Sequence, residues 1–112
     1  MQKYKPAKIG ELNKAAYYHK AVYIQDIGIE KKIPEEEGRL ILVNVTEFSS
    51  NEQVIDDVLT ILENITMVMY QTQIESSGYF KIDDILYEIV GEPQKIDYRF
   101  LKVKIRRVKG GI

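Results

Sequence analysis

The sequence feature that most constrains the fold is a two-residue alternation of apolar and polar side chains in the second half of the chain. A period of two is typical of strands that bury one face, whereas an amphipathic helix repeats every 3.6 residues. The pair Asp83-Asp84 separates two of these segments, and two polar residues between β-runs predict a tight hairpin. The alternating segments are residues 65–70, 79–82, 85–90 and 99–108.

The first half of the chain predicts two more strands and an arm. One strand begins at Ala21, where Val22 and Ile24 alternate with polar neighbours, and the other covers residues 39–48. Gly28 and the cluster at 34–38 predict a long, charged and exposed connection between them. Residues 1–14 are expected to form a flexible arm.

Residues 49–64 predict the one helix of the chain. Ser49 with Glu52, or Ser50 with Gln53, has the spacing of a capping box at a helix start. Apolar residues then follow at helical spacing. The order of elements predicts a mainly β (α+β) fold in a single domain, 1–112: a small antiparallel β-barrel with one helix inserted between the second and third strands. The apolar residues of the predicted helix are Val54, Ile55, Val58, Leu59, Ile61 and Leu62.

The composition argues against covalent or metal-dependent chemistry. The chain has 112 residues, a net charge of −1, no cysteine and one histidine, His19. A histidine-based triad or a zinc site needs partners that are missing here. Asp83-Asp84 is interpreted as a turn, residues 35–37 as a solvated loop, and no glycine spacing matches a phosphate loop. We therefore expect no enzymatic activity, no cofactor and no metal, and no apolar run is long enough for a membrane helix.

Charge is distributed unevenly, with basic ends around an acidic middle. Lys102, Lys104 and Arg106 share one face of the last strand, which we call the basic strand face. One interpretation is that this face balances acids of the same chain or of a neighbouring subunit. The alternative is a single-stranded nucleic-acid module of the OB type, in which the face contacts phosphates and nearby aromatic residues stack on bases. Those aromatic residues are Tyr79, Phe80 and Tyr87.

Three stretches of the second half, in this order, resemble the phage head-closure or head–tail joining proteins, also called head-completion or stopper proteins. Two shorter stretches of the first half, Ile9-Gly10-Glu11-Leu12-Asn13-Lys14 and Ser49-Ser50-Asn51-Glu52, are similar to the opening and to the helix start of that family. The three stretches are Met67-Val68-Met69-Tyr70, the segment from Gly78 to Pro93, and the segment from Ile96 to Lys104.

The resemblance implies a structural virion component of a long-tailed phage or prophage, assembled in the bacterial cytoplasm. Such a protein forms a homo-oligomeric ring under the portal and adaptor, closes the DNA exit channel and provides the surface to which the tail attaches. A monomer is expected in isolation, because rings of this kind form on the preceding ring. The neighbouring class of tail-completion or terminator proteins is the alternative within phage structural proteins.

In that family the excursion between the second and third strands faces or gates the channel. By position, the resemblance assigns this role to Glu52, Gln53, Asp56 and Asp57, whose acids would repel packaged DNA as it passes. The basic strand face is the candidate subunit interface. Partners would be the adaptor, portal and tail proteins of the same phage, with contact to DNA in the channel and none to a membrane.

Overall fold

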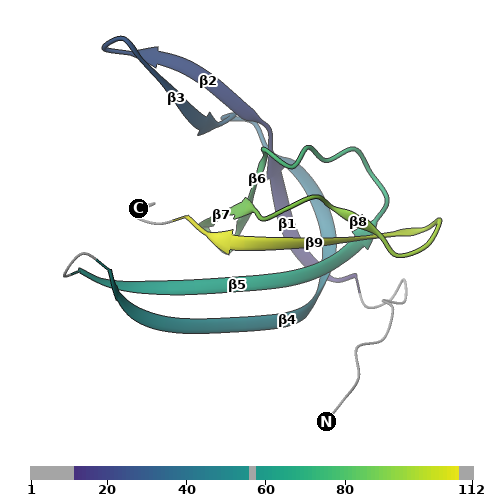
Figure 1. The fold of residues 1–112 in the computed structure, drawn as a ribbon. Coiled ribbons are helices and arrows are strands. Elements are labelled where there is room, and N and C mark those ends of the chain that lie inside the picture. Colours follow the sequence, from purple (N-terminus) through teal and green to yellow (C-terminus); the bar gives the residue numbers. More distant parts are fainter. Residues whose placement is uncertain (1–11, 56–57, 109–112) are drawn as a thin grey trace.

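The computed structural model describes residues 12–55 and 58–108, with the backbone alone described over 51–55 and 58–62. All regular elements in this part of the chain are strands, and they are drawn in Figure 1. They are β1 (Lys14–His19), β2 (Ala21–Asp26), β3 (Ile29–Pro34), β4 (Arg39–Ile55), β5 (Val58–Tyr70), β6 (Tyr79–Ile82), β7 (Ile85–Ile89), β8 (Gln94–Lys95) and β9 (Phe100–Arg107).

Six of these strands form a closed antiparallel barrel. They are hydrogen-bonded in the order β5-β4-β1-β6-β7-β9, and an additional pairing of β5 with β9 closes the ring of strands. The short β8 pairs with β9 outside this ring, and β2 pairs only with β3. Closure leaves the barrel without the unpaired edges that would otherwise join other chains. The predicted mainly β barrel is therefore confirmed.

The core lies inside the barrel and is built from every second residue of its strands. Met67, Phe80 and Val103 are fully buried there, each beside partners on both neighbouring strands. Because successive strand residues point to opposite faces, the alternation that the sequence shows directs one apolar set inward. The buried residues of this cluster are Ala16, Tyr18, Val43, Ile65, Met67, Met69, Phe80, Ile82, Tyr87, Ile89, Leu101, Val103 and Ile105.

A smaller cluster lies on the outside of the barrel, over β5 and β9. Val68 and Phe100 point outward, and Leu12 packs against them so that all three are buried. The ring of Tyr70 stacks on Phe100 with centroids 5.4 Å apart. The chain just before β1 thus covers part of the outer barrel surface. The remainder of the predicted arm, residues 1–11, lies outside the described residues.

Both tight turns have backbone angles of the hairpin type. Asp83 and Asp84 have φ values of 52° and 65°, and they connect β6 to β7 as predicted. Ile27 and Gly28 have φ values of 52° and 74°, and they connect β2 to β3. Positive φ at both central residues matches the right-handed twist of the flanking strands. Residues 21–34 are therefore a second hairpin, which corrects the long connection predicted between Gly28 and residue 38.

The helix predicted over residues 49–64 is wrong for the backbone described there. β4 runs to Ile55 and β5 begins at Val58, and these two strands pair residue by residue from Ile55 and Val58 down to Val43 and Met69. The apolar run has the spacing of a helix, but it is also rich in β-branched residues, which favour a strand. The two arms of the run pair with each other and continue strands that belong to the barrel, which favours the strand. The described residues contain no helix long and apolar enough to cross a membrane.

Candidate interaction surfaces

The residues that were weighed for chemistry are not brought together. His19 Nδ1 donates a hydrogen bond to the carbonyl oxygen of Glu35 at 2.7 Å, and the Glu35 amide donates to the Lys20 carbonyl at 2.6 Å. These hydrogen bonds stabilise the base of the β2–β3 hairpin, so the single histidine has a structural role. Asp83 lies in the β6–β7 turn, and its Oδ2 forms an ion pair with Lys14 Nζ at 2.6 Å. In the described part of the chain, no group of three or more metal-binding side chains is found.

The first candidate surface is the outer part of the β4–β5 hairpin. A bulge between Val45 and Glu47 shifts the register, and the pairing of β5 with β9 ends at Asn64. Beyond that point β4 and β5 pair only with each other, and Figure 1 shows them extending past the barrel. The backbone of Glu52 and Gln53 belongs to this extension, whereas Asp56 and Asp57 lie outside the described residues. Glu52 and Gln53 are thus on a protruding ribbon rather than on a helix.

One ion pair from the end of β9 joins it to the base of that ribbon, and a second joins it to β7. The Arg107 guanidinium contacts the carboxylate of Glu63, which is largely buried. Arg106 contacts Glu88 on β7 at 2.6 Å, across the register pair that joins the two residues. Arg106 therefore balances an acid of its own chain on the neighbouring strand. The basic strand face points outward, since Leu101, Val103 and Ile105 on the opposite face are buried.

The aromatic residues proposed as base-stacking platforms are inside the protein. Phe80 is fully buried, and Tyr79 and Tyr87 are nearly so. Burial raises the pKa of both tyrosines, and for Tyr79 the Glu88 carboxylate raises it further. Lys32 covers the Tyr79 ring at 5.0 Å from its centroid. These three rings therefore offer no surface to a nucleic-acid base, which removes the stacking part of the OB-type alternative.

The second candidate surface is the β2–β3 hairpin, which projects from the barrel on a separate two-stranded sheet (Figure 1). Register pairs put Val22 with Ile33, Ile24 with Lys31, and Asp26 with Ile29 on one face. The other face carries Lys32, which lies over Tyr79 of the barrel. The apolar face thus points away from the barrel, and its tip is strongly exposed, with Ile27 94% and Ile29 69% accessible. A lone two-stranded hairpin is marginally stable in water, so binding to another surface would stabilise the β2–β3 hairpin.

The third candidate surface is an apolar groove on the outer face of β4, which we call the outer groove. It has a volume of about 380 Å³, and Arg39 is the one charged residue in its lining. Leu40 and Leu42 point out of the barrel and are 54% and 50% exposed. Its lining is Leu12, Arg39, Leu40, Ile41, Leu42, Tyr70 and Thr72. Exposed apolar side chains gathered in one concave place are typical of an interaction site.

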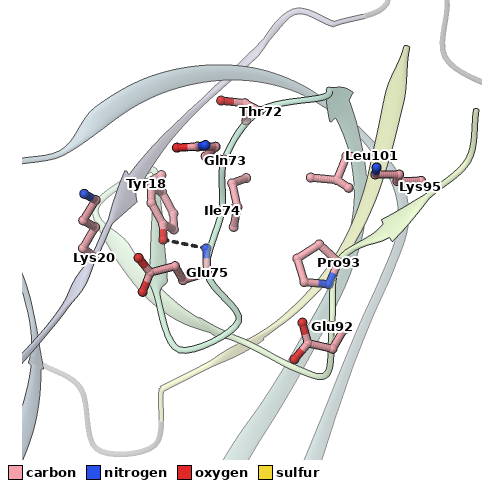
Figure 2. A pocket seen from close by; sticks show the side chains of 10 residues that line it. All are labelled: Tyr18, Lys20, Thr72, Gln73, Ile74, Glu75, Glu92, Pro93, Lys95 and Leu101. Atoms are coloured by element: carbon pink, nitrogen blue, oxygen red, sulfur yellow. Dashed lines mark hydrogen bonds between the residues drawn. The ribbon is translucent and has the colours of Figure 1, made fainter. Parts of the chain in front are cut away.

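A further pocket of about 460 Å³ lies between residues 71–78 and residues 91–95 (Figure 2). Figure 2 shows Leu101 and Ile74 facing each other across it, while the hydroxyl of Tyr18 accepts a hydrogen bond from the Glu75 amide at 2.9 Å. Its rim carries both signs of charge, from Lys20, Lys95, Glu75 and Glu92. No buried polar side chain in the described residues is left without a partner, so nothing in this pocket points to a ligand.

Sequence reasoning did not find the β2–β3 hairpin or the outer groove. The hairpin had one usable signal, Ile27-Gly28 between two runs of strand-forming residues. The groove had none, because it is assembled from segments that are far apart in the sequence.

The comparisons with known proteins bear on the fold. No protein-family model matches the chain, and no curated protein matches it. Among solved structures, a chain from the virion of a native gene transfer agent particle has a similar fold, with a TM-score of 0.68 and 16% sequence identity. The match covers 86% of this chain and 94% of that chain. The likeness therefore extends over nearly the whole of both folds.

Proposed function

We propose that this protein is a non-enzymatic structural component of a phage or prophage virion, or of a related particle. The observation that carries the proposal is the near full-length match in fold to a virion chain of a gene transfer agent. The surfaces described above agree with a role in assembly. Two hairpins project from a closed barrel, and an exposed apolar groove lies on its outer face.

Within this class we propose a head-completion or head–tail connector protein, on the strength of the sequence resemblance. The protein would form a ring under the portal and adaptor, close the DNA exit channel and provide the tail attachment surface. In this role it would be found in the virion after assembly in the bacterial cytoplasm. The protruding part of the β4–β5 hairpin would face the channel, and Glu52, Asp56 and Asp57 would keep the passing phosphates from adhering.

Deletion of the gene from a particle-producing strain tests the proposal. We expect DNA-filled heads that lose their DNA and do not join tails, together with free tails of normal length, and we expect expression of the wild-type chain to restore whole particles. Electron microscopy and nuclease sensitivity of the packaged DNA are the readouts. Stable full heads beside tails of uncontrolled length would indicate a tail terminator instead. Normal infectious particles would overturn the proposal.

Charge reversal tests the channel role separately. The variant Glu52→Lys, Asp56→Lys, Asp57→Lys should assemble and then release DNA more slowly, because cations on the channel wall attract phosphates. The matched control is Glu35→Lys, Glu36→Lys, Glu37→Lys, which reverses the same number of charges near the base of the β2–β3 hairpin. Equal ejection rates for the two variants would contradict the channel assignment.

A further inference from the structure

We infer that the tip of the β2–β3 hairpin, residues 26–30, inserts into the outer groove of a second copy of this chain, and that this contact is the joint between subunits. The inference rests on the proposed function, because it supplies the subunit contact of the proposed ring. It names a surface that differs from the basic strand face, which the charge distribution of the sequence favoured.

The first argument is that the hairpin exposes isoleucines that have no partner among the described residues of its own chain. Ile24 and Ile29 lie on the face turned away from the barrel, and Ile27 occupies the turn. The base of the hairpin is fastened by His19 and Glu35, so the tip is presented at a defined place. A surface that is both apolar and held in position is expected to bind another apolar surface, because exposure to water costs about 25 cal/mol for each Å² of apolar area.

The second argument is that the same chain carries a complementary surface elsewhere. The outer groove is lined by Leu12, Leu40, Leu42 and Tyr70, which match apolar side chains in kind. The groove runs along β4 from Leu42, which pairs with Ala15 near the start of β1, to Arg39, which pairs with Tyr18 near its end, and the hairpin projects beyond that end. A contact between two different patches of identical chains is heterologous, and such contacts generate rings or filaments.

Charge complementarity is the third argument. Asp26 and Glu30 are the two end residues of the tip, and neither forms an ion pair with a described residue, whereas the cation Lys31 is set nearer the hairpin base. Arg39 lines the groove, bound to Thr72 Oγ1 at 2.9 Å and to the Gln73 carbonyl at 2.7 Å. No carboxylate among the described residues lies within ion-pair distance of Arg39. An acidic tip and a cation at the groove orient the insertion and suppress tip-to-tip pairing.

Cross-linking between two single-cysteine proteins tests the inference. The chain has no cysteine, so Ile27→Cys and Leu42→Cys each introduce the only thiol of a protein. Because the isolated chain is expected to be a monomer, a thiol-specific cross-linker has to trap a transient contact, and we expect it to give a dimer in the mixture of the two and little in either alone. The matched control replaces the hairpin thiol with Tyr98→Cys, which is 84% exposed in a different loop. A mixture that yields no more dimer than this control overturns the inference, and so does a strong dimer band from Ile27→Cys alone.

Charge exchange adds a second measurement. Asp26→Lys, Glu30→Lys in the hairpin protein should abolish the dimer band, and Arg39→Glu in the groove protein should restore it. Because Arg39 also holds residues 72 and 73, a second groove variant, Leu40→Asp, is used on its own and should abolish the band without touching Arg39. Circular dichroism melts show that each variant is folded. A band that persists with Leu40→Asp overturns the inference.

Cross-linking in purified particles separates this inference from the proposed function. With both cysteines in one chain, we expect a ladder of multimers of this protein. Cross-linking of the Ile27→Cys thiol to a different virion protein overturns the subunit joint and leaves the virion role standing. Absence of the protein from particles, with no effect of gene deletion, overturns the proposed function whatever the purified protein does.

Discussion

Gly78 is the position where adding one methyl group should have the clearest effect on stability. A Cβ atom built there lies 2.5 Å from Tyr18 Cε1 and 2.9 Å from its hydroxyl oxygen. Carbon atoms in contact keep about 3.5 Å apart, so the tyrosine ring has to move by about 1 Å. The ring is 3% exposed and lies between Phe80 and the Arg39 guanidinium, with centroid distances of 5.4 and 5.5 Å. It therefore has little room to move.

The cost of Gly78→Ala follows from these contacts. Overpacking of a tight core costs about 1–3 kcal/mol. Displacing the Tyr18 hydroxyl breaks its bond from the Glu75 amide, which adds about 1 kcal/mol. Reduced freedom of the unfolded chain offsets about 0.4–1 kcal/mol. The net destabilisation is about 1–4 kcal/mol, so the melting temperature should fall by at least about 4 °C.

Thermal melts followed by circular dichroism, with urea unfolding for the free energy, measure this change. The control is the same substitution in a Tyr18→Leu background, where the shorter side chain no longer reaches residue 78. There Gly78→Ala should cost nothing, so the double-mutant cycle isolates the contact. A melting temperature within about 1 °C of wild type for Gly78→Ala, or an equal loss in both backgrounds, would refute the steric reasoning.

Three other predictions concern the core, a turn and a loop. Met67→Ala removes a fully buried side chain from the barrel and should lower the free energy of unfolding by about 2–5 kcal/mol in a urea titration; an unchanged urea midpoint would contradict the packing described. Asp84→Gly relieves the φ of 65° in the β6–β7 turn and should raise the melting temperature, and a lower value would show that the aspartate has a local partner of its own. Bonds from the amides of Arg99 and Phe100 lower the pKa of Asp97 below its ordinary value of 3.8. The ionised group therefore stabilises the fold above pH 3.8 and loses this effect as the pH falls through its folded-state pKa. Asp97→Asn should thus lower the melting temperature at neutral pH and match wild type in stronger acid; a constant difference at both would contradict the pKa assignment.

The second half of the fold was predictable because two local signals agree there. The alternation assigns the strands, and the Asp83-Asp84 pair marks the turn between β6 and β7. β1 gave no such signal, since its sequence KAAYYH carries adjacent alanines and adjacent tyrosines instead of an alternation. It becomes a strand because β4 and β6 pair with it on both sides. Local pattern cannot report pairing of that kind.

The prediction for the β4–β5 hairpin was wrong for a different reason. Its apolar run meets a helical spacing as well as a strand, and Ser49 with Glu52 resembles a helix start. The same run contains Asp56-Asp57 between β-branched neighbours, which is the pattern that correctly predicted the turn at Asp83-Asp84. Equal weight on that pair would have favoured a hairpin. The outer groove could not be predicted from the sequence, because Leu12, Leu40 and Tyr70 come together only in the folded barrel.

The continuity of β4 and β5 has a mechanical consequence. Each strand passes from the barrel wall into the protruding ribbon without interruption, and no glycine or proline occurs between Gly38 and Gly78 to act as a hinge. β5 is hydrogen-bonded to β9 up to Asn64, and Glu63 and Arg107 brace the point of exit. A force on the ribbon is therefore transmitted through both strands to the barrel wall, and the bulge between Val45 and Glu47 is the place where the ribbon can bend.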